Sequence, residues 1–354
     1  MDKLRAALLG ATGMVGQRFV KLLTGHRMFE LTVLAASPRS AGKRYREAAH
    51  WCVEGDVPEE VADLRVVRVG LEEVRREDDV DVVFSAIPSE LAREVEPEFA
   101  RAGIPVISDA SAFRMEEDVP ILIGEVNPDH LKLVKLQARR GWRSFIVTSP
   151  NCTTNELMIA LKPLMDRFGI RRVIVSTMQA LSGAGWTGVP SMAIADNVIP
   201  YIRNEEEKVE REALKILGRF DGSRIVPAEL EISASCHRVN VLEGHLEAVF
   251  VELSRGADIE EVKEAMRKFR GRPQELGLPT APENPIIVRE EEDRPQPRLD
   301  RYAGGGMSVV VGRVRRDKVL ENGVKFLVLG HNTIRGAAGN AILNAELAVS
   351  EGYI

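Results

Sequence analysis

The sequence predicts an α/β protein of two domains, the first of which contains a parallel, doubly wound sheet. Its 354 residues are more than one ordinary hydrophobic core accommodates. In the N-terminal part, short apolar runs alternate with amphipathic segments of helical spacing, as they do in parallel sheets covered by helices on both faces. A glycine-rich turn joins the first apolar run to the first helical segment.

The first strand is expected over residues 4–9, and a helix should follow the glycine turn. The spacing GxxGxxG from residue 10 to residue 16 meets the needs of a tight turn, a close backbone approach to phosphate and close helix–strand packing. The helix N-terminus then offers free N–H groups to an anion. We therefore expect a dinucleotide in contact with Gly10, Thr12, Gly13, Met14, Val15 and Gly16.

A second strand, "ELTVLAA", leads into "SPRSAGKRY", where NAD-binding sheets usually carry an acidic residue for the ribose hydroxyls. This loop instead offers hydroxyl groups and cations, from Ser37, Arg39, Ser40 and Lys43. Such groups suit a 2′-phosphate, so the loop favours NADP as the cofactor. The alternative interpretation is a solvated basic loop that holds no ligand.

Further apolar runs are expected to complete the first sheet. Strands are predicted within "LRVVRV", "VDVVFSAI" and "IPVISDAS", and two more runs, "PILIGEV" at 120–126 and "SFIVTSP" at 144–150, should extend the sheet. The segment that follows contains the candidate catalytic residues.

Composition disfavours several classes of partner and site. The formal net charge of −5 gives no field that favours nucleic acid or an anionic membrane. No run approaches the roughly 18 apolar residues of a membrane span, and the start lacks a secretory pattern. Three widely spaced cysteines without a CxxC pair, and six scattered histidines, disfavour disulfides and a zinc site. We therefore expect a cytoplasmic protein without a metal.

Cys152 lies in "TSPNCTTNEL", at the predicted start of a helix. Apolar residues from Leu157 to Phe168 follow helical spacing, and Asn151 offers an N-capping oxygen. A helix N-terminus lowers the pKa of a thiol, which makes Cys152 a candidate nucleophile with thiolate available near neutrality. A small buried hydrophobe is the alternative, and it fits Cys52 and Cys236 better because neither is placed at a recognisable helix start.

A nucleophile needs a base, and "CHRVNVLEGHLEAVFVEL" supplies two histidines on strand-like runs. These are His237 and His245. Arg238 precedes His245 by seven residues across a turn at "LEG", so Arg238 and His245 are candidates to flank one pocket. Each residue alone is more often structural than catalytic.

Several ordered motifs together resemble the aspartate-β-semialdehyde dehydrogenase family, in its archaeal and fungal branch. They are "GATGMVGQRF", "SPNCTT", "TMQALSGAGWTGVPS", "RVNVLEGHLE" and "HNTIRGAAGNAILNAEL". The resemblance implies an NADP-binding Rossmann domain over 1–150, with a C-terminal helix (332–354) packing back on it. It also implies a catalytic and oligomerisation domain over 151–331, built on a mixed sheet as in glyceraldehyde-3-phosphate dehydrogenase, and a homodimer or homotetramer.

The same resemblance implies a reaction and the residues that perform it. The family interconverts aspartyl-4-phosphate and aspartate-4-semialdehyde with NADP, on the route to lysine, threonine and methionine. Cys152 corresponds to the nucleophile, His245 to the acid/base, and Gln179 to the glutamine beside the nucleophile. The resemblance gives further cofactor contacts at Ser182, Gly183, Gly185 and Asn332.

Substrate contacts follow from the resemblance in the same way. Arg238 corresponds to the arginine that holds the α-carboxylate, and Asn151 and Arg114 line the phosphate position. Glu205 and Lys208 fit an acidic–basic pair for the substrate amine and the phosphate, although the register within "EEEK" is ambiguous. A malonyl-CoA-type reductase of the same fold and a catalytically inactive NADP-binding regulator are the rival readings.

Overall fold

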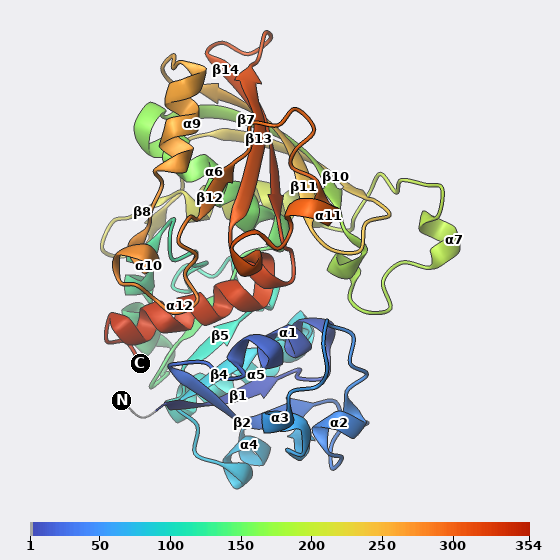
Figure 1. Ribbon diagram of the computed structural model, residues 1–354. Helices are drawn as coiled ribbons and strands as arrows, with labels where there is room; N and C mark the ends of the chain where they lie inside the picture. Colours follow the sequence, from blue (N-terminus) through green and yellow to red (C-terminus); the bar gives the residue numbers. More distant parts are fainter. Residues whose placement is uncertain (1–2) are drawn as a thin grey trace.

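The N-terminal part of the chain builds a six-stranded sheet in which all neighbouring strands are parallel. The computed structural model describes residues 3–354, and this sheet occupies the lower part of Figure 1. Its strand order, β3-β2-β1-β4-β5-β6, reverses direction between β1 and β4, and ligands bind at the carboxyl ends of strands beside such a switch point. The strands are β1 (Leu4–Leu9), β2 (Phe29–Ala36), β3 (Val66–Arg68), β4 (Val82–Ser85), β5 (Val106–Ser108) and β6 (Ile146–Thr148).

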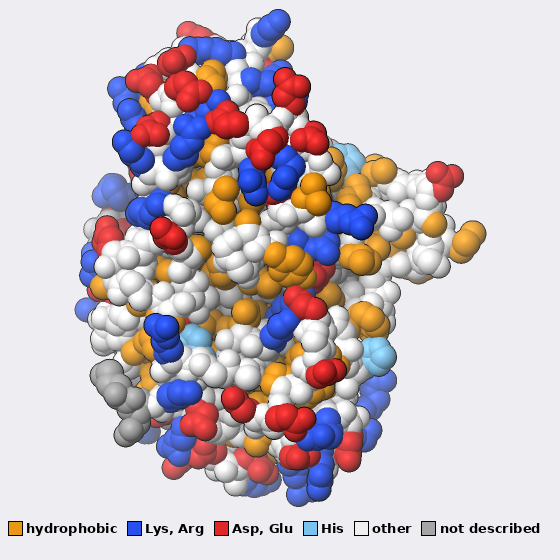
Figure 2. Space-filling view, viewed as in Figure 1, with side chains coloured by type: hydrophobic (Ala, Val, Ile, Leu, Met, Phe, Trp, Pro, Cys, Tyr) orange, Lys and Arg blue, Asp and Glu red, His pale blue; other side chains and the backbone are white. Residues whose placement is uncertain are grey.

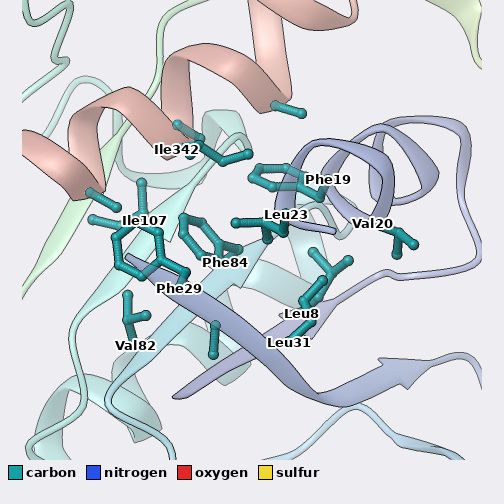
Figure 3. Packing of buried hydrophobic residues seen from close by; sticks show 14 of the residues in the cluster. Leu8, Phe19, Val20, Leu23, Phe29, Leu31, Val82, Phe84, Ile107 and Ile342 are labelled. Atoms are coloured by element: carbon teal, nitrogen blue, oxygen red, sulfur yellow. The ribbon is translucent and has the colours of Figure 1, made fainter. Parts of the chain in front are cut away.

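Helices cover both faces of this sheet, as the sequence pattern predicts. The apolar positions of α1 are buried against β1, β2 and β4, and Figure 3 shows Phe19 of α1 close to Phe29 and Phe84 of the strands. The helical segments are α1 (Met14–Leu23), α2 (Tyr45–Ala48), α3 (Glu59–Ala62), α4 (Leu71–Glu77), α5 (Ser89–Ala102), and the 3₁₀ segments η1 (Ser111–Phe113) and η2 (Pro128–Arg140).

The C-terminal helix packs into the same core, but it is shorter than the predicted 332–354. Helix α12 runs from Gly339 to Ser350, and Ile342 contributes to the core cluster drawn in Figure 3. The residues before it form a π-helical turn, η5 (Ile334–Ala338). This turn is fixed by Arg335, which is fully buried and makes a bidentate ion pair with Glu125 at 2.8 and 2.9 Å.

The strand predicted over 120–126 is absent from the described structure, where Ile121 makes one isolated bridge to Thr148. The side chain of Asn127 explains the difference. It donates to the Ile121 carbonyl at 2.8 Å and accepts from the Ile123 N–H at 2.9 Å. These bonds close a turn, so the apolar run is buried without joining the sheet.

The second part of the chain builds a mixed six-stranded sheet, which confirms the predicted fold class. Its order is β10-β7-β11-β14-β13-β12, with parallel pairs at both edges and antiparallel pairs between them. The strands are β7 (Ile170–Gln179), β10 (Glu231–Arg238), β11 (His245–Leu253), β12 (Ile286–Val288), β13 (Val309–Arg316) and β14 (Gly323–Gly330), with a separate hairpin of β8 (Arg219–Phe220) and β9 (Ile225–Val226).

Helix α6 begins at Cys152 and crosses one face of this mixed sheet, where its apolar side chains join the strands in a second core. Register sets the ends of the strands: Gln179 pairs with Arg238, and His245 pairs with Gly330, all at one end of the sheet. The helical segments are α6 (Cys152–Phe168), η3 (Leu181–Ala184), α7 (Ser191–Ile194), α8 (Glu205–Ile216), α9 (Ile259–Arg267), α10 (Arg272–Glu275), α11 (Pro297–Asp300) and η4 (Ala303–Gly306).

A segment around α7 projects from the side of the molecule in Figure 1. Its side chains Met192, Val198 and Tyr201 are 91%, 54% and 59% exposed, and Figure 2 shows apolar side chains on this projection. Exposed apolar surface of this kind is typical of protein–protein contacts. Within residues 3–354, no helix combines the length and the apolar character that a membrane crossing needs.

The packing of α12 predicts a measurable stability effect. Replacing Ile342 with Ala removes buried methyl and methylene groups between α12 and the first sheet, and should lower the free energy of unfolding by about 2–5 kcal/mol. Val319→Ala is the control, because Val319 is 90% exposed and its truncation should change stability by less than about 0.5 kcal/mol. Denaturant unfolding measures both; equal effects would show that α12 is not part of this core.

Candidate active site

A cavity of about 390 Å³ opens between the two sheets, at the N-terminus of α6. Both parts of the chain line it. The first part contributes the glycine-turn residue Val15, the loops after β4 and β5, and Arg114. The second part contributes the end of β7, the end of β10, the start of α8 and the segment before α12. The predicted site residues among its lining are Val15, Arg114, Asn151, Cys152, Gln179, Ser182, Gly183, Glu205, Lys208, Arg238 and Asn332.

The glycine turn between β1 and α1 has little space for side chains. Gly10 has φ +86°, and a Cβ there would lie 2.4 Å from the Ala86 carbonyl oxygen. A Cβ on Gly16 would lie 2.1 Å from the Gly10 carbonyl oxygen. Gly13 is the N-cap of α1 and is less crowded, with its nearest contact at 3.4 Å. The turn is therefore a bare backbone cradle before a helix N-terminus, which fits a phosphate group.

The basic loop after β2 lies beside this cradle. The N–H groups of Gly10 and Ala11 both donate to the Ala35 carbonyl, at 2.8 and 3.0 Å, which ties the turn to the end of β2. Arg39 and Lys43 are exposed on the loop that follows. Ser37 and Ser40 are joined by a turn hydrogen bond of 2.9 Å from the Ser40 N–H to the Ser37 carbonyl.

A second glycine loop, η3, approaches the end of the mixed sheet. A Cβ on Gly183 would lie 2.7 Å from Arg238 Nη1 and 3.3 Å from the His245 ring, so only glycine fits there without displacement. Gly185 has φ +78°. Asn332 connects this loop to the sheet, since its Nδ2 donates to Ser182 Oγ at 2.8 Å.

Cys152 is the first residue of α6, as the sequence predicts, and Asn151 caps the helix by accepting from the Thr154 N–H at 3.2 Å. Cys152 Sγ lies 3.2 Å from His245 Nε2. The loop before α12 packs closely on the other side, because a Cβ on Gly336 would lie 2.6 Å from Cys152 Cβ. The structure thus brings the predicted nucleophile and acid/base into contact.

Burial raises the pKa of the Cys152 thiol above its usual range, and the Glu205 and Glu156 carboxyl groups raise it further. The Thr153 N–H and the Arg238 guanidinium lower the pKa, but they do not compensate. The direction of this shift runs against the expectation of a thiolate near neutrality. A sequence shows the helix N-terminus that stabilises a thiolate, but it does not show the desolvation that opposes it.

His245 is neutral for a similar reason. Burial, with help from Arg238 and His331, lowers the pKa of His245 to about 3. The Ala180 N–H donates to Nδ1 at 3.1 Å, so the ring proton is assigned to Nε2. The Nε2–H group therefore points at Cys152 Sγ as a hydrogen-bond donor. An uncharged thiol and an uncharged imidazole form the reactive pair.

Arg238 and Gln179 stand next to this pair. Arg238 is buried, and its Nη1 donates to the Ala180 carbonyl at 2.6 Å. The N–H of the same residue, Ala180, donates to His245. Gln179 is 1% exposed, and its Nε2 donates to Thr177 Oγ1 at 3.3 Å. Both side chains line the cavity, and Arg238 and His245 both lie next to Gly183.

The first turn of α8 carries the predicted acidic–basic pair, and the structure settles its register. Glu205 is buried and accepts from Asn151 Nδ2 at 2.8 Å and from Lys208 Nζ at 3.3 Å. Its neighbour Glu206 instead accepts from the Cys236 N–H at 2.9 Å. Lys208 keeps about a third of its side chain exposed at the cavity.

Arg114 also reaches the cavity, but it is held by a partner that the sequence analysis does not identify. Its Nη1 donates to Glu212 Oε1 at 3.0 Å, and its Nη2 donates to the Asp109 carbonyl at 2.8 Å. Glu212 lies seven residues after Glu205, a helical spacing that puts both on one face of α8. That spacing is the one signal that points to Glu212.

Comparisons with known proteins agree with this geometry. Residues 5–134 match the family described as "Semialdehyde dehydrogenase, NAD binding domain", and residues 161–335 match "Semialdehyde dehydrogenase, dimerisation domain". An aspartate-semialdehyde dehydrogenase from Methanothermobacter thermautotrophicus is 57% identical, over 96% of this chain and 97% of that protein. One from Archaeoglobus fulgidus is also 57% identical, over 98% of each.

The chain belongs to the aspartate-semialdehyde dehydrogenase family.

Two further similarities bear on cofactor and substrate. The crystal structure of aspartate semialdehyde dehydrogenase with NADP from Candida albicans has a TM-score of 0.90, with 40% identity over 99% of this chain and 100% of that one. A malonyl CoA reductase (NADP) from Metallosphaera sedula is 42% identical, over 99% of this chain and 98% of that protein. As a family member, the protein is an oxidoreductase for an aldehyde-type substrate, and its dimerisation domain supports a homo-oligomer.

The raised thiol pKa predicts how this semialdehyde dehydrogenase family member reacts with an alkylating agent. Because little thiolate is present at neutrality, inactivation by iodoacetamide should accelerate roughly tenfold per pH unit from about pH 7 to about pH 9. Residual activity after timed exposure measures the rate. A Cys52→Ala/Cys236→Ala variant is the matched control, in which Cys152 is the one remaining thiol. A rate already level below about pH 7 would mean that the thiolate is stable in the free enzyme.

Proposed function

We propose that the protein is an NADP-dependent aspartate-semialdehyde dehydrogenase. It reduces L-aspartyl-4-phosphate to L-aspartate-4-semialdehyde through a thioester on Cys152, in the biosynthesis of lysine, threonine and methionine. The observation that carries the proposal is the 3.2 Å contact of Cys152 Sγ with His245 Nε2 at a helix N-terminus, beside a cavity that is lined by Cys152 and by the cations Arg114, Lys208 and Arg238. The family membership supports the same reaction.

In the oxidative direction, Cys152 Sγ gives its proton to solvent and attacks the aldehyde carbon, which forms a C–S bond and breaks the C=O π bond to leave a tetrahedral oxyanion. The His245 Nε2–H donor and the backbone N–H groups at the start of α6 are the candidates to stabilise that oxyanion. Loss of hydride from the carbon leaves a thioester. A phosphate oxygen then attacks the thioester, the C–S bond breaks, and the acyl phosphate leaves. Biosynthesis runs these steps in reverse.

The substrate would be held by charged side chains on two sides. Arg238 presents a guanidinium, which grips a carboxylate bidentately, and Glu205 offers a carboxylate to the substrate amine. Lys208, Asn151 and Arg114 lie on the side assigned to phosphate. A small amino acid with a phosphorylated side chain fits this arrangement of charge.

NADP would lie between the glycine cradle and the second glycine loop. The tight backbone packing at Gly10 and Gly16 shapes the turn, the less crowded Gly13 leaves room for a pyrophosphate group, and the exposed Arg39 and Lys43 suit a 2′-phosphate. When bound, this cofactor accepts or supplies the hydride. Asn332 and Gly183 line the same cavity as Val15 and Cys152, where they would position the nicotinamide.

The domain assignment follows from these roles. Residues 1–150 together with 332–354 form the cofactor domain in this proposal, and residues 151–331 form the catalytic and oligomerisation domain. A homodimer or homotetramer in the cytoplasm is expected, and the apolar projection around α7 is available for such contacts.

Reduction of an acyl-CoA, as in a malonyl-CoA-type reductase, is the second candidate function. It is favoured by the relative that is 42% identical and is named as a malonyl CoA reductase. Lys208 separates the two. With Lys208→Ala, the KM for phosphate should rise about tenfold to hundredfold, because a charged hydrogen bond contributes about 1.5–3 kcal/mol. Initial rates of semialdehyde oxidation against phosphate concentration measure this. Oxidation that saturates with CoA and ignores phosphate or arsenate would support the rival reaction.

The loop after β2 predicts cofactor preference. Arg39→Ala should raise the KM for NADP about tenfold or more, since it removes a charged contact to the 2′-phosphate, and should leave the KM for NAD nearly unchanged. Arg27→Ala provides the control, since Arg27 lies outside this loop. If the two cofactors serve equally well in the wild-type enzyme, the loop is only a solvated basic surface.

A further inference from the structure

One buried carboxylate joins two separate parts of the cavity wall. Glu212 of α8 is 3% exposed, and each of its oxygens accepts one hydrogen bond. Oε1 accepts from Arg114 Nη1 at 3.0 Å, and Oε2 accepts from the Asn151 N–H at 2.7 Å. Glu212 therefore connects a cation from the first part of the chain to the residue that caps α6.

Helix α8 holds the same two partners by additional contacts. Glu205 lies on the same face of the helix, two turns before Glu212, and accepts from the Asn151 side chain at 2.8 Å. Lys215 donates to the Arg114 carbonyl at 2.7 Å, and also to the Glu116 and Val119 carbonyls at 2.7 Å. The backbone and the side chain of both Arg114 and Asn151 are thus fixed to one helix.

The two cations assigned to phosphate are held very differently. Arg114 is buried, with one amino nitrogen on Glu212 and the other on the Asp109 carbonyl, so its guanidinium has a fixed orientation. Lys208 is a partly exposed ammonium on a long side chain, and it forms an ion pair with Glu205. Directional binding of a phosphate at this place therefore depends on Arg114 more than on Lys208.

We propose that Glu212 is a positioning residue of the phosphate subsite, which fixes the Arg114 guanidinium against the N-terminus of α6. The inference deepens the proposed function and rests on it. Glu212 is buried and is not among the residues that line the cavity, so it acts through Arg114 and Asn151. Phosphate, and the phosphoryl group of the acyl phosphate, are the ligands whose binding it controls.

Glutamine cannot replace this carboxylate without loss. Its one oxygen can accept from Arg114 or from the Asn151 N–H, and its amide NH₂ then faces the other donor. One buried donor is left without an acceptor, which releases the guanidinium from its fixed orientation. The contacts of Arg238 with the substrate carboxylate lie on another element, β10, and should be unaffected.

The test measures semialdehyde oxidation by NADP⁺ against phosphate concentration in Glu212→Gln, Arg114→Ala and the double variant. Glu212→Gln should raise the KM for phosphate about tenfold, with the KM for the semialdehyde changed less than about twofold. In the Arg114→Ala background, Glu212→Gln should raise the KM for phosphate by less than about a further threefold. The reason is that the effects of two substitutions that remove the same contact are not additive. Glu207→Gln, on the exposed side of the same helix, is the matched control and should behave as wild type.

Additive effects of the two substitutions, or a Glu212→Gln enzyme with the wild-type phosphate KM, would overturn the inference. A parallel rise in every KM, with a lower melting temperature, would show a merely structural role and overturn it as well. If Glu212→Gln does not fold, Arg114→Lys tests the same contact, since lysine keeps the charge and loses the planar fork. A wild-type enzyme that does not respond to phosphate is a different result, which rejects the proposed function itself.

Discussion

The N-terminus of helix α6 is the point on which the rest of the site depends. Cys152 is the first residue of that helix, and it is held from three directions. His245 of β11 contacts its sulfur, Gly336 of the loop before α12 packs on its Cβ, and Asn151 caps the helix in front of it. Because these contacts come from distant parts of the chain, the folding of both sheets determines where one sulfur atom lies.

Burial gives this site its electrostatic character. It raises the pKa of the Cys152 thiol and lowers the pKa of His245 to about 3, so the pair rests in an uncharged state. The hydrogen bond from the Ala180 N–H to Nδ1 directs the Nε2–H towards the sulfur. A neutral donor in a desolvated pocket suits stabilisation of an oxyanion that forms during the reaction, because the interaction strengthens as charge develops.

Local signals in the sequence predicted the elements whose causes are local. The glycine turn was predictable because its spacing reflects steric needs within seven residues, and the start of α6 was predictable because Asn151 is a good N-cap. The prediction of a strand at 120–126 was wrong because the side chain of Asn127 closes a turn there, which the apolar pattern does not reveal. Helix α12 begins later than predicted because the backbone leaves helical geometry at Ala337, in the π-helical turn before it.

The parts of the site that sequence reasoning missed depend on distant contacts. Glu212 bonds to residues 98 and 61 positions earlier in the chain, and only its helical spacing from Glu205 marks it among many glutamates. The raised pKa of Cys152 and the lowered pKa of His245 could not be predicted for the same reason, since desolvation exists only after packing. The family resemblance identified the residues of the site. The structure added the directions of their pKa shifts and the residues that hold them in place.

The central claim is that Cys152 carries the acyl group during turnover. The direct measurement mixes the enzyme with aspartate semialdehyde and NADP⁺ in the absence of phosphate, stops the reaction in acid, and determines the mass of the peptide that contains Cys152. The account predicts an aspartyl thioester on Cys152, with about one equivalent of NADPH per active site, and its discharge when phosphate is added. NADPH formed without a mass change on Cys152, or an acyl group on Cys52 or Cys236, would contradict it.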